Sequence, residues 1–501
     1  MDAPGVVILG AMHGPASTPR RTLAERRALA ERLGEIVGPE NVLWSDYDLM
    51  LYEFDGSIDR AIPDAVALPA SAEQVAAIVR LCNRERVPVV PRGAGTGLSG
   101  GALPIEGGVV LSFSLLNRIL EIDLPNLRAI VEPGVVNLHI SHAVAEHGLY
   151  FVPDPSSQKA STIGGNVGEN SGGPHTLIYG VTTNHVLGME IVTAEGEIIH
   201  TGGKAVDAPG YDLTGLFCGS EGTMGIVTKI VVRLTPVAED VKTLLGIFET
   251  IEAASQTVSD IIASGVIPAA LEMMDGLALQ AVEAATHAGY PTDAGSVLLV
   301  EVEGMRDGIE DLVEGIRALC DRNGAREVRL AASARERALL WAGRKNAFSA
   351  MGRISPDFYV MDGVIPRTRL PEVLAKIDEV SRRTGLRIAN VFHAGDGNLH
   401  PLCLFDGDVP GQTELARQVG AEILRICAEA GGALTGEHGI GIEKRDLMPL
   451  VFSDADMDVM RLARQAWDPT GLCNPGKVLP TPGLCLDVTE TRHGRAVLVG
   501  W

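Results

Sequence analysis

The sequence predicts an α+β protein with an antiparallel sheet in its second half. Between residues 60 and 135, short apolar runs typical of strands alternate with helical patterns. After Pro236 a new series of strands and helices begins and continues to about residue 436, in an order that favours an antiparallel sheet with helices on one face. The length of 501 residues indicates two or three domains. We expect boundaries near residues 40, 238 and 436.

The elements of the first half follow from apolar spacing and from residues typical of helix starts and turns. Residues 1–20 are predicted to form a loose extension. Predicted helices cover residues 23–38, 71–83 and 137–147, the second of which begins with Ser71 and Glu73. Predicted strands cover residues 87–91, 129–131, 186–192, 198–200 and 226–234.

The second half shows the same two periodicities. Predicted strands cover residues 243–248, 269–273, 296–302, 388–392 and 399–405. Predicted helices cover residues 251–264, 276–287, 308–323 and 457–467. A cluster of turn residues at 468–477 ends the pattern, and we expect this segment to return to the first half of the chain.

Charge and cysteine content exclude several classes of function. Sixty-four acidic against 42 basic residues give a net charge of -22, which argues against nucleic acid or an anionic membrane surface as the main partner. The seven cysteines include no C-x-x-C, which favours reduced thiols in the cytoplasm over a disulfide framework or an iron–sulfur cluster. No apolar run reaches transmembrane length, and residues 6–9 are too short for a signal segment. Any membrane association is expected to be peripheral, through a partner.

Glycine-rich segments provide the first candidate site. Residues 91–101, 161–173 and 219–225 are dense in glycine, which permits positive φ and lets backbone N–H groups converge on an anion such as a pyrophosphate. Gly95, Gly97 and Gly100 satisfy G-x-G-x-x-G, but Pro104 and a strand pattern follow where a Rossmann fold requires a helix. Three such segments favour a larger dinucleotide held by several loops over ordinary tight turns.

Histidine and glutamate provide the second candidate site. His393 and His400 flank a Gly-Asp-Gly turn between two predicted strands, so a hairpin would place both imidazoles at its mouth. Glu437 can supply a third ligand, giving a catalytic metal site with open positions. His438 is then free to accept a proton from a metal-bound hydroxyl group. The alternative is that these histidines merely cap turns.

These motifs together resemble a known family. The segments 91–101, 163–173, 219–225, 393–401, 436–441 and 468–477 are similar to those of the flavin-bearing subunits of bacterial glycolate oxidases. These belong to the D-2-hydroxy-acid dehydrogenase branch of the vanillyl-alcohol oxidase and p-cresol methylhydroxylase (PCMH) type of FAD enzymes. The resemblance covers about residues 40–480.

The resemblance implies a domain plan and two cofactors. After an N-terminal extension and helix (1–40), it implies a two-part PCMH-type FAD-binding domain (41–238) and a ferredoxin-like antiparallel substrate domain with the metal hairpin (239–436). A helical C-terminal cap (437–501) then returns to the FAD domain. It also implies a divalent metal over the flavin, with zinc or manganese expected. The first glycine loop lacks the histidine that tethers FAD in some relatives, so non-covalent FAD is expected.

The resemblance also assigns site residues. The expected FAD-binding residues are Arg92, Gly93, Ala94, Gly95, Thr96, Gly97, Leu98, Ser99, Pro153, Ser161, Thr162, Gly164, Gly165, Asn166, Gly168, Asn170, Gly172, Gly173, Glu221, Gly222, Gly225, Ile226 and Asn474. Arg344 matches an arginine with which relatives bind the substrate carboxylate, and guanidinium geometry suits that task. Its neighbour Lys345 is expected to be solvated.

A small 2-hydroxy acid is the expected substrate, oxidised by hydride transfer to flavin after metal-assisted deprotonation. Relatives that oxidise D-2-hydroxyglutarate use extra polar and basic groups, whereas Leu402 follows His400 by two positions and residues 359–361 contain no lysine. Glycolate, or alternatively D-lactate with the chain acting alone, is therefore favoured. A flavin-free metal-dependent hydrolase is the alternative from another class.

The fate of the electrons predicts partner proteins. The chain has neither a cysteine spacing for an iron–sulfur relay nor a credible nicotinamide site. The resemblance implies a second flavin-type subunit and an iron–sulfur subunit that lead electrons toward membrane quinone.

Overall fold

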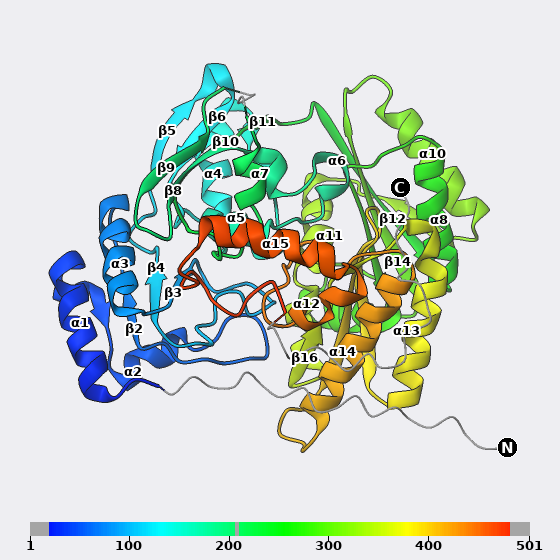
Figure 1. The fold of residues 1–501 in the computed structure, drawn as a ribbon. Helices are drawn as coiled ribbons and strands as arrows, with labels where there is room; N and C mark the ends of the chain where they lie inside the picture. Colours follow the sequence, from blue (N-terminus) through cyan, green and yellow to red (C-terminus); the bar gives the residue numbers. More distant parts are fainter. Residues whose placement is uncertain (1–19, 206–209, 481–501) are drawn as a thin grey trace.

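The computed structural model describes residues 20–205 and 210–480. In Figure 1 the first half of the chain, blue to green-cyan, lies beside the second half, green to orange. The predicted extension at residues 1–20 lies outside the described residues except for Arg20, and Cys485 lies outside them as well.

The first sheet positions the first glycine segment. Its strands β2 (Ala65–Ala67), β4 (Val109–Ser112) and β3 (Val89–Arg92) run parallel, and their apolar runs are buried on both faces, which is typical of parallel sheets. In order across the sheet the strands are β1 (Val42–Leu43), β2 (Ala65–Ala67), β4 (Val109–Ser112) and β3 (Val89–Arg92). Helices α1 (Leu23–Val37) and α3 (Ala72–Glu85) cover one face, and α2 (Asp46–Leu49) follows β1. The described stretch between β3 and β4 contains no helix, so the exclusion of a Rossmann fold is confirmed.

The second sheet is antiparallel and positions the other two glycine segments. Its strands in order are β5 (Ile119–Asp123), β6 (Arg128–Val131), β10 (Ile226–Arg233), β8 (Val186–Val192) and β9 (Ile198–Gly202). Around it lie α4 (Asn137–Val144), α5 (Ile163–Glu169), α7 (Leu213–Phe217) and a small pair, β7 (Leu149–Tyr150) with β11 (Thr235–Pro236). Helix α6 (Thr176–Tyr179) instead packs against the core of the second half through Leu177.

Helix α5 differs from the expectation, because residues 163–169 were predicted to lie in a loop. Three glycines in seven residues disfavour a helix by propensity. Ile163 and Val167, however, are fully buried against the second sheet, and this packing outweighs the propensity. At its N-terminal end, the N–H groups of Ile163 and Gly164 donate to the carbonyls of Val135 and Pro133 at 2.9 and 2.8 Å. Thr162, just before the helix, lies against Gly93 of the first glycine loop.

The second half is built on one large sheet that is antiparallel throughout. Its strands in order are β15 (Glu327–Leu330), β12 (Asp240–Phe248), β14 (Ser296–Gly304), β13 (Ala270–Asp275), β18 (Arg387–His393), β19 (Asn398–Phe405) and β16 (Asp357–Val360), and β17 (Gly363–Val364) also pairs with β19. The α+β class with an antiparallel second sheet is thus confirmed.

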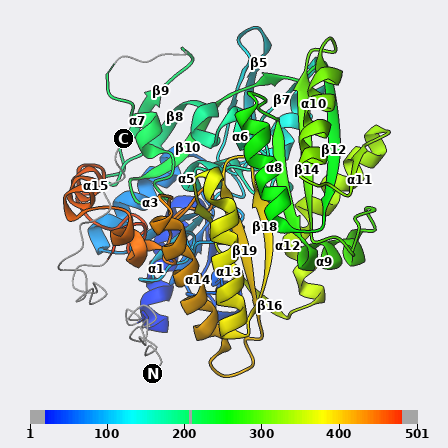
Figure 2. The same ribbon diagram turned by 90° about the vertical axis from the view of Figure 1, so that its right-hand side faces the viewer.

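The expectation of helices on one face of this sheet was wrong, because helices cover both faces. One face packs against α8 (Ile251–Ala263), α10 (Ile309–Arg322), α13 (Leu370–Thr384) and α14 (Gln412–Glu429). The other packs against α9 (Gly276–Thr286), α11 (Ala334–Lys345) and α12 (Ala347–Ala350), and Figure 2 shows these two groups apart. The reason lies in β14 and β19, whose residues are buried consecutively instead of alternately.

The C-terminal part of the described chain lies against both halves. Helix α15 (Asp454–Trp467) crosses between them in Figure 1, and the segment after it pairs with β3 through Asn474 N–H and the Val89 carbonyl (2.8 Å). The Asn474 side chain donates to the carbonyls of Gly101 and Glu221, and Lys477 donates to that of Leu103. These bonds hold two glycine loops together.

Two further expectations concern cysteines and membranes. The six cysteines among the described residues are buried, and none of these forms a disulfide. Within the described ranges, no helix combines the length and apolarity needed to cross a bilayer.

Candidate active site

A hairpin of β18 and β19 carries the two histidines. Register pairs His393 with Asn398 and Val391 with His400, so the histidines form a diagonal pair on one face of the hairpin and do not face each other directly. Their ring centroids are 5.1 Å apart and their planes nearly perpendicular. Both side chains are buried, His400 at 1% exposure.

The orientation of His393 is fixed by Glu272, which lies on the neighbouring strand β13. Glu272 oxygens lie 2.8 and 2.9 Å from His393 Nδ1, so this nitrogen donates its proton to the carboxylate. His393 Nε2 then faces Glu437 Oε1 at 3.0 Å. A carboxylate behind a histidine is the usual support of a metal ligand. Glu272 was missed by the sequence analysis.

His393, His400 and Glu437 bring one ligand atom each to within 4.8 Å of one another, in the set expected from the sequence. Both ring nitrogens of His400 are buried without a hydrogen-bond partner, and its Nε2 stands 3.4 Å from Glu437 Oε1. Burial would raise the pKa of Glu437, but the three surrounding histidines lower it to about 2, so it is a carboxylate. The unsatisfied imidazole and the N₂O donor set fit a divalent metal.

His438 stacks on His400, with ring centroids 4.7 Å apart and an interplanar angle of 7°. Burial lowers the pKa of His438 to about 4, so the imidazole is neutral near pH 7 and able to accept a proton. Its side chain lines the same cavity as the glycine loops.

Asp362, which the sequence analysis also missed, holds the loop that carries Glu437 and His438. Its fully buried carboxylate accepts from the N–H groups of Gly436, Glu437 and His438, at 3.1, 3.3 and 2.9 Å. It also accepts from the Thr435 hydroxyl and the Lys444 ammonium. Asp362, His400 and His438 form a second group with metal-ligand spacing. No sequence motif marks Asp362, because the residues that it contacts in this loop lie 73 or more positions later in the chain.

Arg344 lies in this site and not at the surface. Its side chain is 2% exposed and contacts Glu272 Oε2 at 2.6 Å. Its Nε is buried without a hydrogen-bond partner, although the residue lines the cavity. The guanidinium therefore keeps donors for an anion.

The expectation that Lys345 is solvated was wrong. Its ammonium donates to Asp154 Oδ2 at 2.7 Å, and the residue lines the cavity. Asp154 stands 191 positions away in the sequence, so no local pattern could have indicated this contact.

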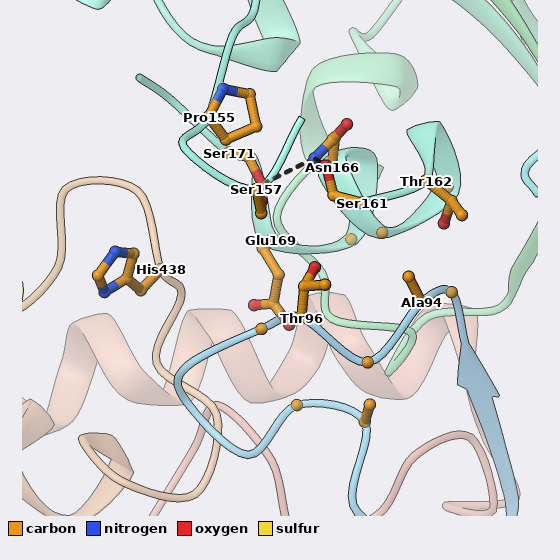
Figure 3. A pocket seen from close by; sticks show the side chains of 18 of the residues that line it. Ala94, Thr96, Pro155, Ser157, Ser161, Thr162, Asn166, Glu169, Ser171 and His438 are labelled. Carbon is orange, nitrogen blue, oxygen red and sulfur yellow. Dashed lines mark hydrogen bonds between the residues drawn. The ribbon is translucent and has the colours of Figure 1, made fainter. Parts of the chain in front are cut away.

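One cavity of about 330 Å³ joins the glycine loops to the histidines. In Figure 3, Ala94 and Thr162 lie at one side of it, and His438 projects from a separate loop at the other. The expected cofactor residues on its wall are Arg92, Gly93, Ala94, Gly95, Thr96, Gly97, Leu98, Ser161, Thr162, Gly164, Gly165, Asn166, Gly168, Glu221, Gly222, Gly225 and Ile226, and His393, His400, Glu437, His438 and Arg344 also line it.

Six expected cofactor residues do not line the cavity: Ser99, Pro153, Asn170, Gly172, Gly173 and Asn474. They support the loops from behind. The Ser99 carbonyl accepts from Ile442 N–H, and Asn170 Oδ1 accepts from Thr183 N–H. Glycine is needed at 173, where φ is +148° and a Cβ would overlap the Asp154 backbone.

The cavity wall fits a dinucleotide. Arg92 Nη1 and the Thr162 hydroxyl, both from residues that line the cavity, are buried polar groups without hydrogen-bond partners. A Cβ on Gly93 would overlap the Thr162 hydroxyl, so a side chain at position 93 has no room between the two glycine segments. Unpaired buried donors and close backbone approach are what a phosphate-bearing ligand requires.

Comparison with known proteins identifies the family. Residues 63–202 match the family model described as FAD binding domain, and residues 237–478 match that of the FAD linked oxidases, C-terminal domain. The chain is 49% identical over 473 residues to the glycolate oxidase subunit GlcD of Escherichia coli (strain K12), covering 94% of this chain and 95% of that protein. The chain belongs to the FAD-linked oxidase family.

This FAD-linked oxidase is also 33% identical over 436 residues to the D-lactate dehydrogenase of Archaeoglobus fulgidus, covering 85% of this chain and 95% of the relative. The solved structure of p-cresol methylhydroxylase with substrate bound superposes with a TM-score of 0.78 at 18% identity, covering 92% and 98% of the two chains. These comparisons confirm that this chain has the PCMH-type fold and is an FAD-dependent oxidoreductase.

Proposed function

We propose that this enzyme oxidises a small D-2-hydroxy acid, with glycolate as the first candidate, to the 2-oxo acid. The observation that carries the proposal is one cavity that joins the FAD-binding loops to the His393, His400 and Glu437 triad, with His438 and Arg344 beside it. A flavin-free hydrolase would have no use for the glycine-loop part of this cavity, and the FAD-binding family match argues against it.

The cofactors are assigned by the groups that would hold them. The glycine loops would hold FAD without a covalent link, and His393, His400 and Glu437 would hold a divalent metal, zinc or manganese. When bound, FAD supplies a hydride acceptor and the metal supplies a Lewis acid that favours the alkoxide form of a hydroxyl group.

The residues of the chain divide the remaining work. Arg344 binds the substrate carboxylate through its free donors and orients the acid, since Glu272 fixes the guanidinium from behind. Neutral His438 takes the proton of the substrate hydroxyl at a ring nitrogen. Asp362 keeps His438 in place through the backbone of its loop.

The identity of the acid rests on relatives and on the cavity wall. Leu402, which suggested a small acid in the sequence, lies in the core of the second sheet and does not line the cavity. Phe348 does line it, and its ring meets that of His400 edge-on at 5.6 Å. An apolar ring at this position limits room beside the triad and favours a short acid. D-lactate, with the chain as a dehydrogenase acting alone, is the second candidate, supported by the D-lactate dehydrogenase relative.

We further propose that electrons leave the flavin through partner proteins. Support comes from the relative's name as a subunit of glycolate oxidase. The proposed partners are a second flavin-type subunit and an iron–sulfur subunit, in the cytoplasm at the inner face of the membrane.

The function is tested by dye-coupled turnover of the purified yellow chain with glycolate, D-lactate and L-lactate. Turnover with glycolate or D-lactate and little with L-lactate is expected, and acid precipitation should release the flavin into the supernatant. A flavin-containing preparation that oxidises none of these acids would overturn the proposal.

A further inference from the structure

Two consecutive cations at the end of α11 line the cavity, yet each has a different partner. Arg344 contacts Glu272 within the second half of the chain. The side chain of Lys345 leaves the helix in another direction, and its ammonium bonds Asp154 of the first half. The remaining Lys or Arg side chain on the cavity wall is that of Arg92, at the first glycine loop.

Asp154 lies directly behind the cavity wall. It is 9% exposed, and its successors Pro155, Ser156 and Ser157 form part of the wall. Its Oδ2 accepts from Lys345 Nζ at 2.7 Å and lies 3.0 Å from His175 Nδ1. Its Oδ1 is buried without a hydrogen-bond partner. A carboxylate oxygen with no donor thus lies buried behind this part of the wall.

The Asp154 and Lys345 pair is fixed from both sides. His175 Nε2 lies 3.5 Å from Glu301 Oε1, and the His175 ring stacks on Trp341 at 5.7 Å. Lys345 Nζ lies over the same indole, 5.9 Å from its centroid. Trp341 itself donates to Glu301 at 2.6 Å. Neither partner of Asp154 can leave without breaking other contacts.

We propose that Asp154 is a specificity-determining residue that restricts the enzyme to 2-hydroxy acids with a single carboxylate. This inference rests on the proposed function, in which Arg344 binds the carboxylate next to the reacting carbon. A second carboxylate requires a second cation. The cation adjacent to Arg344 is Lys345, and its ammonium already forms an ion pair with Asp154. Discrimination therefore comes from the attractive partner that a second carboxylate does not find.

The test compares acids of equal length with one and two carboxylates. The pairs are D-lactate with tartronate and D-2-hydroxybutyrate with D-malate, assayed with a dye acceptor on the FAD-loaded chain. Asp154→Asn keeps the shape of the side chain and removes its charge. It should raise kcat/KM for the diacid relative to the monoacid by about tenfold or more, the scale on which one placed charge discriminates substrates. The double variant Asp154→Asn with Lys345→Met should lose this gain.

Lys345→Met alone is the matched control. It should retain FAD and keep the KM for the monoacid within about threefold of the original value, since Lys345 is held away from the single carboxylate. An unchanged ratio of diacid to monoacid in Asp154→Asn would overturn the inference. A rise in the diacid to monoacid ratio that survives in the double variant would also overturn it. So would a tenfold rise of the monoacid KM in Lys345→Met, and this second result can be obtained even if Asp154→Asn does not fold. Failure of the unaltered chain to oxidise any monoacid would instead refute the proposed function.

Discussion

His393 depends for its orientation on Glu272, a residue 121 positions earlier in the chain. The same carboxylate contacts Arg344 at 2.6 Å, so one buried acid supports both a proposed metal ligand and the proposed substrate-binding cation. Burial would raise the pKa of Glu272, but Arg344 and His393 hold it below its usual range, which keeps it ionised. The two proposed functions are thus coupled through one side chain.

Replacement of Glu272 by glutamine should therefore weaken both functions. The amide keeps the size of the side chain but removes the charge that fixes His393 and Arg344. Metal affinity should fall about 10-fold to 100-fold, the usual cost of losing the support of a histidine ligand, and the KM for the acid should rise. Metal titration and steady-state kinetics measure the two effects. A variant with normal metal affinity would show that Glu272 has no role in holding the metal.

The two histidines that stack on each other should respond differently to replacement. His400→Ala removes a ligand, so the chain should lose its divalent ion and its turnover while the flavin spectrum persists. His438→Ala should keep the ion, yet turnover should fall about a hundredfold or more, as is typical when a general base is lost. Elemental analysis beside turnover separates these cases. Near-normal turnover of the His438 variant would remove this residue from the mechanism.

At the scale of elements, the glycine segments function as a packed pair. The loop after β3 and the start of α5 approach so closely that a Cβ on Gly93 would overlap the Thr162 hydroxyl. Behind them, the side chain of Asn474 connects the first and third glycine segments through the carbonyls of Gly101 and Glu221. The shape of the proposed FAD site is therefore set by close contacts between segments far apart in the chain.

Gly93→Ala should accordingly reduce FAD retention during purification without unfolding the second half. The matched control is Gly315→Ala in α10, where a Cβ would meet no atom within 4 Å and φ is negative. This control should bind FAD normally and be at least as stable, because alanine favours a helix by about 1 kcal/mol over glycine. The ratio of flavin to protein absorbance measures the outcome, and full flavin content in Gly93→Ala would contradict the packing argument.

Elements with strong local patterns could be predicted from the sequence, and those set by tertiary packing could not. The hairpin of β18 and β19 follows from apolar runs around a Gly-Asp-Gly turn. Helix α5 was missed because its glycines disfavour a helix and only the burial of Ile163 and Val167 stabilises it. In the site, His393, His400, Glu437 and His438 occur in compact motifs, whereas Glu272, Asp362 and Asp154 are lone acids whose partners are distant in sequence.

At the scale of the molecule, ionic contacts join the two halves of the chain around the cavity. Asp154 of the first half binds Lys345 of the second, and His175 lies between Asp154 and Glu301. A separate pair, Arg417 with Asp59 at 2.7 Å, joins the halves elsewhere. The contacts at Asp154 surround part of the active site, so they link the relative placement of the halves to the shape of the cavity.

This arrangement predicts a pH dependence of stability. Burial would lower the pKa of His175, but Asp154 and Glu301 raise it to about 10. A group whose pKa is raised by folding stabilises the folded state fully below its ordinary pKa of 6.5 and loses that contribution as the pH rises through about 10. The original chain should therefore lose more stability between pH 7 and 10 than His175→Gln. Chemical denaturation at several pH values measures this, with the exposed His147→Gln as control. If the free energy of unfolding changed with pH in the same way for the original chain and for His175→Gln, the prediction would be contradicted.

The absorbance of the bound flavin in a single anaerobic turnover is the most direct test of the proposed chemistry. It shows whether a metal-assisted oxidation of a 2-hydroxy acid delivers electrons to flavin in this cavity. The metal-loaded chain is mixed with glycolate or D-lactate, and the measurement is repeated after chelation and after the ion is restored. We predict rapid loss of the oxidised flavin band with the ion, little loss after chelation and recovery of the rate on restoration. Equal bleaching with and without the ion, or none with either acid, would contradict the account.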